Sequence, residues 1–192
     1  MLNWDELKKQ CLSCTRCGLC QNRTNVVFGV GPHDADIMFV GEGPGEQEDL
    51  QGEPFVGAAG KLLDEMLSII DLGRHNCYIA NIVKCRPPRN RDPQEDEQAA
   101  CMDYLRNQVA LIRPKIIVCL GRIAAKKLID PDYRITKEHG QWICSNGVWM
   151  TAIYHPSALL RDLNKRPETF DDLLCIRDKY KEVHANIGNR ND

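Results

Sequence analysis

The sequence predicts an α/β fold whose central sheet is mostly parallel. Short apolar runs with strand composition alternate along the chain with segments that carry apolar residues at helical spacing. One of these runs, Ile116–Gly121, is apolar throughout, which is typical of a parallel strand buried on both faces. The length of 192 residues suits one domain with a substantial core, so we expect residues 1–192 to form a single domain.

The first half of the chain predicts strands and helices around a long glycine-rich loop. Asn3 is a residue type that caps helices, and the prolines after residue 86 forbid regular structure there. In order, we expect a helix over 3–10, a short strand or hairpin arm over 26–30, a core strand over 37–40, a glycine-rich loop over 41–60, a helix over 61–70, a strand over 76–83 and a proline-rich loop over 84–93.

The second half continues the same alternation. Asp92 is a suitable N-cap for the next helix, with Pro93 in its first turn, and Ser157 can cap a later one. In order, we expect a helix over 94–112, a strand over 116–121, a short helix over 122–129, an irregular stretch over 130–147 with room for an edge strand near Trp142, a strand over 148–154, a helix over 157–163 and a final helix over 168–185.

Composition limits the classes of function. The net charge of −2 gives no overall nucleic-acid-binding signature, so any such contact must rest on local patches. No apolar run approaches the ~18 residues of a membrane span, and the first residues do not resemble an export signal. We therefore expect a cytoplasmic protein without membrane contact, and we expect it to act as a monomer.

The ten cysteines predict a metal or redox site, because disulfides are rare in a reducing compartment. Cys14-x-x-Cys17 places two thiols on one turn. Cys85 lies in the proline-rich loop, and Cys101 lies on the helix expected to follow it. Four thiolates can hold a cubane iron–sulfur cluster or a zinc ion, and spacing alone does not choose between these.

A second ligand set is open on the same residues. Cys11, Cys14, Cys17 and Cys20 recur at every third position, as in a local ferredoxin-like set, but the trailing Cys-Pro of that pattern is missing. Other cysteines are expected to be small buried apolar residues, namely Cys77, Cys119 and Cys175.

Distinctive polar residues follow three of the predicted strands. Glu42 follows the first core strand, with Phe55 further along the same glycine-rich loop. Asn81 lies near the end of the second strand, and His155 follows the last one. Ligands of open α/β sheets bind beyond the carboxyl ends of the strands, so we expect these residues at one edge. A carboxylate and an aromatic ring on a glycine-rich loop indicate a planar ring held against a backbone cradle.

Three segments together resemble a known family. GEGPGEQEDLQGEPFVGAAG, NIVKCRPPRNRDP and HPSALLR, in this order and with similar gaps, resemble the motifs of the bacterial and archaeal family 4 uracil-DNA glycosylases. The likeness runs from Cys14 to Arg161, with one departure at Gly43, where many members carry alanine. The loop Lys84–Pro88 lacks the histidine-bearing insertion of a sister branch that cross-links to its product.

The resemblance implies a three-layer α/β/α sandwich with a central four-stranded parallel sheet. It implies a monofunctional enzyme that acts on uracil-containing DNA, flips deoxyuridine out of the helix and hydrolyses its N-glycosidic bond. Free uracil and an abasic site would be the products. It also implies a [4Fe–4S] cluster that ties the segment over 11–20 to the loop and helix over 84–101. The implied cluster ligands are Cys14, Cys17, Cys85 and Cys101.

The resemblance also implies roles in uracil recognition and catalysis. Phe55 would stack on the flipped ring, and the Asn81 amide would pair with uracil N3–H and O4. His155 would donate to uracil O2, where negative charge develops. Glu42 would orient or deprotonate the attacking water, or stabilise the oxocarbenium-like sugar. The backbone of Gly41 and Gly43 would line the pocket, and Glu48 would fill the space that the C5 methyl of thymine needs.

DNA contacts are expected from two further segments. Ser157 and Arg161 would hold phosphates, and Leu159 or Leu160 would insert where the base left the stack. Lys84, Arg86, Arg89 and Arg91 form a dense basic patch that would meet the DNA backbone.

Three alternatives remain open from the sequence. One is a non-catalytic iron–sulfur protein that binds nucleic acid, in which Glu42, Asn81 and His155 need not converge. Another is a glycosylase that acts on a wider range of deaminated bases. The third, suggested by the cysteine content alone, is a small redox protein.

Overall fold

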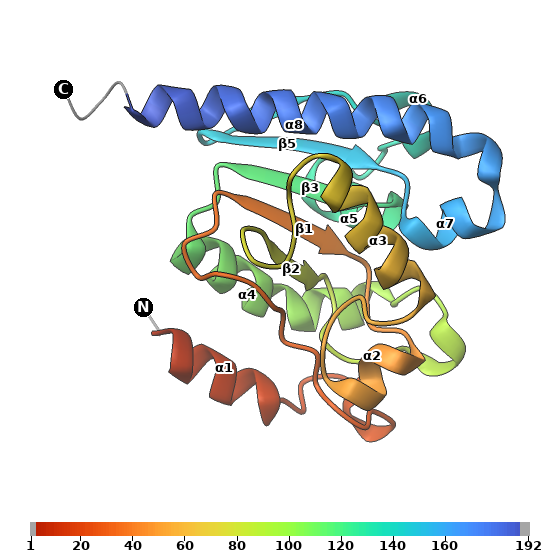
Figure 1. The fold of residues 1–192 in the computed structure, drawn as a ribbon. Helices are drawn as coiled ribbons and strands as arrows, with labels where there is room; N and C mark the ends of the chain where they lie inside the picture. The colour runs from red at the N-terminus through yellow and green to blue at the C-terminus, as the bar shows by residue number, and fades with distance from the viewer. Residues whose placement is uncertain (1–2, 189–192) are drawn as a thin grey trace.

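A computed structural model describes residues 3–188 and shows one central sheet with helices on both faces (Figure 1). Within this range the sheet has the strand order β2-β1-β3-β5-β4. Neighbours among β2, β1, β3 and β5 are parallel, and β4 pairs antiparallel with β5 at one edge. The strands are β1 (Ile37–Gly41), β2 (Tyr78–Asn81), β3 (Ile116–Leu120), β4 (Ile143–Ser145) and β5 (Val148–Ile153).

The strand register brings the functional segments to one edge of the sheet. Gly41 at the end of β1 is opposite Asn81 at the end of β2. Leu120 at the end of β3 is opposite Ile153 at the end of β5. The loops that follow these four strands therefore begin side by side.

Side chains alternate between two hydrophobic cores, one on each face of the sheet. In β1, Met38 and Val40 belong to one core, whereas Ile37 and Phe39 belong to the other. The helices of the first core are α1 (Trp4–Leu12), α4 (Glu95–Ile112) and α5 (Arg122–Leu128). Those of the second are α3 (Ala58–Ile69), α7 (Pro156–Arg161) and α8 (Arg166–Gly188).

The fold class predicted from the sequence is confirmed, with one strand more than the resemblance implies. The additional strand, β4, is exposed and follows Trp142, where the sequence left room for an edge strand. The remaining short helical elements are α2 (Glu46–Gln51), α6 (Ile135–Glu138) and the 3₁₀ turns η1 (Gly18–Gln21), η2 (Pro88–Asn90) and η3 (Leu163–Lys165).

Several local expectations were wrong, among them Ser157 as the cap of α7, whose N-cap is His155, and the burial of Cys175, which is exposed. The glycine-rich loop is not irregular throughout, because its acidic stretch forms α2, whose first turn contains Glu46 and Glu48. Residues 26–30 do not form a strand, and Val30 makes only an isolated bridge to Ile79. The N-cap of α4 is Gln94 rather than Asp92, because Gln94 and Glu97 form a reciprocal capping box.

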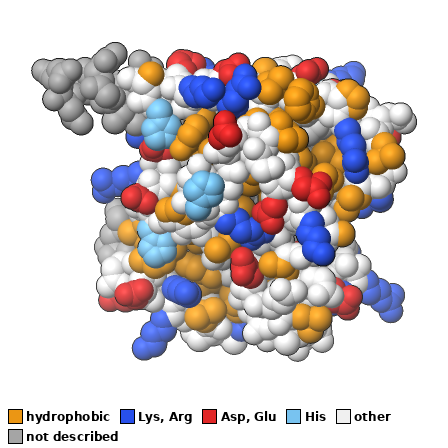
Figure 2. Space-filling view, viewed as in Figure 1, with side chains coloured by type: hydrophobic (Ala, Val, Ile, Leu, Met, Phe, Trp, Pro, Cys, Tyr) orange, Lys and Arg blue, Asp and Glu red, His pale blue; other side chains and the backbone are white. Residues whose placement is uncertain are grey.

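The surface carries charges of both signs. On the face shown in Figure 2, basic and acidic side chains are interspersed with apolar ones and do not gather into one large area of a single sign. Among the described residues, no helix has the length and apolar character that crossing a membrane requires.

Candidate active site and cysteine cavity

A cavity of about 580 Å³ opens at the carboxyl edge of the sheet. It is lined by residues from the loops after β1, β2, β3 and β5. The structure therefore brings together the side chains that the sequence predicts at the strand ends. Ser157 and Arg161, which are the predicted phosphate contacts, lie beside them. The predicted residues in the lining are Glu42, Gly43, Glu48, Phe55, Asn81, Arg91, His155, Ser157 and Arg161.

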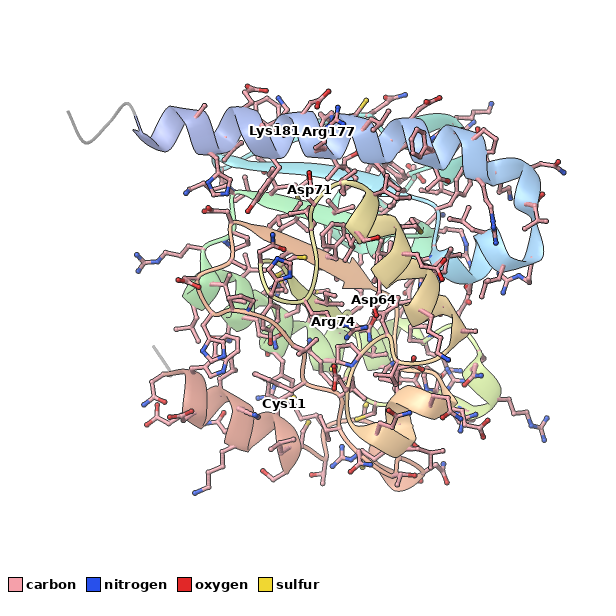
Figure 3. All side chains as sticks on the ribbon, in the orientation of Figure 1. Cys11, Asp64, Asp71, Arg74, Arg177 and Lys181 are labelled. Atoms are coloured by element: carbon pink, nitrogen blue, oxygen red, sulfur yellow. The ribbon has the colours of Figure 1, made fainter. Side chains whose placement is uncertain are left out.

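Phe55 is held by its backbone in an unusual conformation. Its φ angle of 55° lies in the left-handed region, which side chains other than glycine seldom adopt. The guanidinium of Arg74 donates to the carbonyls of Phe55 and of Pro54, the latter at 2.9 Å. Arg74 lies beside Asp64 in Figure 3, with 3.0 Å between Nε and Oδ1. A Cβ at Gly60 would overlap the Phe55 carbonyl, so this contact requires glycine.

Glu48 stabilises the same loop from the other side. Its Oε1 accepts hydrogen bonds from the backbone N–H groups of Val56 at 3.0 Å and Gly57 at 2.9 Å. The carboxylate thus joins α2 to the residues directly after Phe55. Its predicted contact with the thymine methyl position stays a prediction, and the structure adds a loop-positioning role that the sequence did not indicate.

Asn81 carries a buried acceptor that faces no protein donor. Its side chain is 1% exposed, and its Oδ1 is one of two buried side-chain atoms without a hydrogen-bond partner among the described residues. A Cβ at Gly41 would lie 2.5 Å from this oxygen and 2.6 Å from Cζ of Phe55. The absence of a side chain at Gly41 therefore allows Asn81 and Phe55 to approach the same space. A buried unpaired acceptor costs about 1–3 kcal/mol, so a ligand that donates to it recovers that energy.

His155 is oriented by the first turn of α7. The Ser157 backbone N–H donates to His155 Nδ1 at 3.1 Å, and Ser157 Oγ lies 2.8 Å from the same nitrogen. Because Nδ1 accepts, the neutral ring carries its proton on Nε2. Burial, together with the nearby Arg161 cation, lowers the pKa of His155 to about 4, so the ring is neutral at pH 7. Its centroid lies 5.6 Å from that of Phe55.

Glu42 has a carboxyl group that titrates near neutral pH. Burial raises the pKa of Glu42 to about 7. Asp92 contributes to this increase, whereas Arg122 opposes it, and these two residues form an ion pair of 2.6 Å beside the cavity. A carboxyl group with this pKa can accept a proton from water at physiological pH.

The predicted DNA contacts differ in how available they are. Leu159 is 2% exposed and belongs to the core under α7, so it cannot insert into DNA. Leu160 is 43% exposed, and the insertion stays a prediction for this residue alone.

The basic patch is only partly free. Lys84 is fully buried, so its predicted contact with the DNA backbone is wrong. Arg91 donates to both carboxylate oxygens of Glu97, at 2.9 and 2.7 Å. Arg86 donates to the side chain of Asn90 at 2.8 Å, whereas Arg89 is exposed on the 3₁₀ turn η2.

A second, smaller cavity is lined by six cysteines. They come from α1 and the loop after it, the loop after β2, and α4. Arg23 Nη1 donates to Cys85 Sγ at 3.2 Å, and the Lys84 backbone N–H donates to Cys101 Sγ at 3.3 Å. The six thiols belong to Cys11, Cys14, Cys17, Cys20, Cys85 and Cys101.

The chemistry of this cavity fits a metal centre bound by thiolates. Among residues 3–188, no group of three or more histidine, cysteine or acidic side chains is arranged to hold a metal ion. Zinc draws four sulfurs to about 2.3 Å from one centre, whereas a cubane spreads its ligands over several irons. The two cationic residues beside the sulfurs, Arg23 and Lys84, suit a group with negative charge. Both proposed ligand sets line the cavity, so the structure leaves the choice between them to experiment.

Two contributors to the site were not expected from the sequence. Arg74 lies in the loop between α3 and β2, which carries no motif, and its contact with Phe55 crosses 19 positions of the chain. Arg122 is the first residue of α5 and follows the buried strand β3. Its position after a strand end is the sequence feature that could have marked it as a site residue. Neither side chain could be assigned without the packing of α3 and α5 against the sheet.

Comparison with known proteins finds relatives that match most of the chain. The model of the uracil DNA glycosylase superfamily matches residues 28–175. A type-4 uracil-DNA glycosylase of Archaeoglobus fulgidus is 45% identical, over 98% of this chain and 93% of that protein. The type-4 enzyme of Sulfurisphaera tokodaii is 46% identical over 91% and 83%, respectively. That of Thermotoga maritima is 50% identical over 78% and 79%.

Proposed function

The chain belongs to the uracil-DNA glycosylase superfamily and to its type-4 members, and from this premise we propose that it removes uracil from DNA. The reaction is hydrolysis of the N-glycosidic bond of a flipped deoxyuridine, which leaves an abasic site for base excision repair. The observation that carries this proposal is the buried, unpartnered Oδ1 of Asn81 in the cavity that Phe55 and His155 also line.

The Asn81 amide supports selection of uracil over cytosine. Its Oδ1 can accept from uracil N3–H, and its Nδ2 can donate to O4. Cytosine presents an acceptor at N3 and a donor at C4, so both contacts would be lost and the amide would remain buried without partners. A site of this kind discriminates by orders of magnitude.

His155 is suited to stabilise the departing base without giving up a proton. As the glycosidic bond breaks, negative charge accumulates on uracil, including O2. The neutral imidazole donates from Nε2 while Ser157 fixes Nδ1. A preorganised donor to developing charge is worth about 10²–10³ in rate.

Glu42 is suited to act on the opposite side of the bond. In its ionised form it accepts a proton from the attacking water and stabilises positive charge on the sugar. Phe55 provides a face for the uracil ring, and Glu48 holds the loop that carries Phe55. The Glu48 carboxylate would also exclude the C5 methyl of thymine.

The DNA backbone would be held near the mouth of the cavity. Ser157 and Arg161 line the cavity and would bind phosphates, and Leu160 would enter the gap in the stack. Arg86 and Arg89 would add electrostatic contacts, which makes the affinity dependent on salt. Arg91, which is paired with Glu97, would contribute less.

We also propose that Cys14, Cys17, Cys85 and Cys101 hold a [4Fe–4S] cluster. When bound, the cluster would serve as a rigid link between the N-terminal segment and the loop that carries Cys85. The proposed reaction uses no electron from it. We propose that the protein works as a monomer in the cytoplasm.

The test is release of free uracil from a single-uracil oligonucleotide, with matched thymine and cytosine oligonucleotides and no added metal. We expect release from the uracil substrate alone, and we expect Asn81→Ala to lower the rate by at least about tenfold. A panel with hypoxanthine separates strict uracil use from wider specificity. If protein with a full complement of iron releases no uracil, the non-catalytic alternative is favoured.

A further inference from the structure

The strand that carries Asn81 lies at an edge of the sheet. β2 pairs with β1 on one side, and no strand lies beyond it among residues 3–188. Ile79 uses its outward-facing backbone groups to bond Val30, at 2.7 and 2.9 Å. Alternation along the strand turns the backbone groups of Asn81 to the same open side. The peptide that follows Asn81 is therefore held by β1 on one side only, where the Ile82 N–H donates to the Gly41 carbonyl at 2.9 Å, and its carbonyl has no strand partner on the other side.

A buried lysine takes the place of the missing strand. Lys84 is 1% exposed, and its ammonium group donates to the Asn81 backbone carbonyl at 3.0 Å. It also donates to Gln108 Oε1 at 2.7 Å. A buried ammonium is costly unless it is well hydrogen-bonded, so its position is defined closely by these acceptors.

Gln108 anchors this lysine to the body of the protein. It is completely buried in α4, and its Nε2 donates to the Phe28 carbonyl at 2.9 Å and to the Tyr78 hydroxyl at 3.1 Å. With Oε1 on Lys84, the oxygen and the NH₂ group of the amide are all hydrogen-bonded, so the amide cannot rotate without losing bonds. The network thus connects a long helix, the edge strand and the turn after Asn81.

We propose that Lys84 and Gln108 are positioning residues for uracil recognition, which they support by fixing the Asn81 peptide. The inference rests on the proposed function, since it concerns how Asn81 meets the base. Its consequence is that the amide is aligned before uracil arrives, so little binding energy is used to order it. Loss of the network leaves the Asn81 carbonyl without its donor, so the peptide is held by the Ile82 N–H bond to Gly41 alone and the Oδ1 acceptor beside Gly41 is less closely fixed.

The experiment compares four variants by their inhibition constants for free uracil, with iron content and thermal unfolding measured on each. Gln108→Leu removes the anchor, and the double variant Lys84→Met with Gln108→Leu removes both buried partners. The double variant leaves no buried ammonium without an acceptor, so it is expected to fold and keep its iron, with a lower unfolding temperature because the Phe28 carbonyl and the Tyr78 hydroxyl each lose a partner. Tyr78→Phe is the matched control, because it removes one Gln108 contact and leaves the Lys84 acceptors in place. Asn81→Ala reports on the proposed function itself.

We expect Gln108→Leu and the double variant to bind free uracil on the order of tenfold more weakly, as for loss of a charge-assisted hydrogen bond. Tyr78→Phe should stay within about twofold of the unmodified protein. The inference is overturned if the folded double variant binds uracil as the unmodified protein does while Asn81→Ala does not. If Asn81→Ala also leaves uracil binding unchanged, the amide recognition in the proposed function fails, and the positioning inference fails with it.

Discussion

The loop after β2 contributes residues to both cavities of this protein, but the two cavities are built in different ways. The first, which we call the base pocket, takes its side chains from loops that follow parallel strands. The second, the cysteine cavity, takes its thiols from α1, from two loops and from α4. The base pocket therefore depends on the sheet, whereas the cysteine cavity depends on how segments outside the sheet are joined.

The cavities also differ in how their polar groups are satisfied. In the base pocket, Asn81 Oδ1 has no protein partner, and the nearby His155 is kept neutral. In the cysteine cavity, the protein itself supplies donors to sulfur through Arg23 and the Lys84 backbone. A site for a transient ligand needs polar groups that are free to bond the ligand. A site for a permanently bound group needs protein donors that stay hydrogen-bonded to its ligand atoms. We infer that the proposed catalysis and the proposed structural link lie in separate cavities.

The largest effect is expected from breaking the cysteine cavity. Cys85→Ser removes a proposed ligand from the loop after β2, so we expect the visible iron absorbance of anaerobically purified protein to be lost. The measurement is the absorption spectrum with an iron and zinc count. Cys20→Ser is the matched control in the same cavity and should keep its iron. The reverse pattern would establish the local set of Cys11, Cys14, Cys17 and Cys20 as the ligands.

The next largest effect is expected from removing the donor of the base pocket. His155→Ala should lower the single-turnover rate by about 10²–10³ while iron content stays the same. His155→Gln keeps an N–H donor and should lose less. Because the pKa of His155 is about 4, its neutral form persists on acidification, so this ring should contribute no loss of rate between pH 8 and about 5. A histidine limb near pH 6.5 would contradict this.

A smaller effect, in pH dependence, tests Glu42. Burial holds its pKa at about 7, above the ordinary value, so the carboxylate is lost as the pH falls below 7. The rate should therefore fall roughly tenfold per pH unit on the acid side and level off above pH 7. Glu42→Gln should abolish this limb along with most of the activity.

The neighbours of Glu42 should move that limb in opposite directions. Asp92 raises the pKa of Glu42, so Asp92→Asn should shift the midpoint to lower pH. Arg122 lowers it, so Arg122→Gln should shift the midpoint to higher pH. The pH profile of the single-turnover rate for each variant provides the measurement. Shifts of the same sign in both variants would contradict the opposite effects on the pKa of Glu42 that are assigned to Asp92 and Arg122.

The sequence allowed much of the base pocket to be predicted, because strand-end positions follow from the α/β alternation. Asn81 lies at the end of an apolar run, and Glu42 and His155 each follow one. All three line one cavity, as expected. The register that places Gly41 between Asn81 and Phe55 could not be predicted, because it depends on how β1 and β2 pair.

The contacts that position these side chains were beyond the sequence. Lys84 was assigned to a basic patch on the surface, since a lysine among arginines is usually solvated. Its burial follows from the packing of α4 beneath the edge strand, which provides Gln108 as an acceptor. Leu159 and Leu160 had equal claims as the residue that inserts into DNA until the face of α7 that packs on the core was known.

The smallest effect is expected at the contact between Arg74 and Phe55. Phe55 adopts a positive φ, a conformation that costs of order 1–3 kcal/mol and persists only where its surroundings impose it. Arg74→Met removes the donors to the carbonyls of Pro54 and Phe55 and should weaken free-uracil binding by about tenfold or less.

Asp64→Asn is the matched control, because it removes the ion pair with Arg74 and keeps those donors. The measurement is the inhibition constant of free uracil. Equal losses in both variants would show that Arg74 acts on Phe55 through the Asp64 ion pair, and the role assigned to its carbonyl contacts would be wrong.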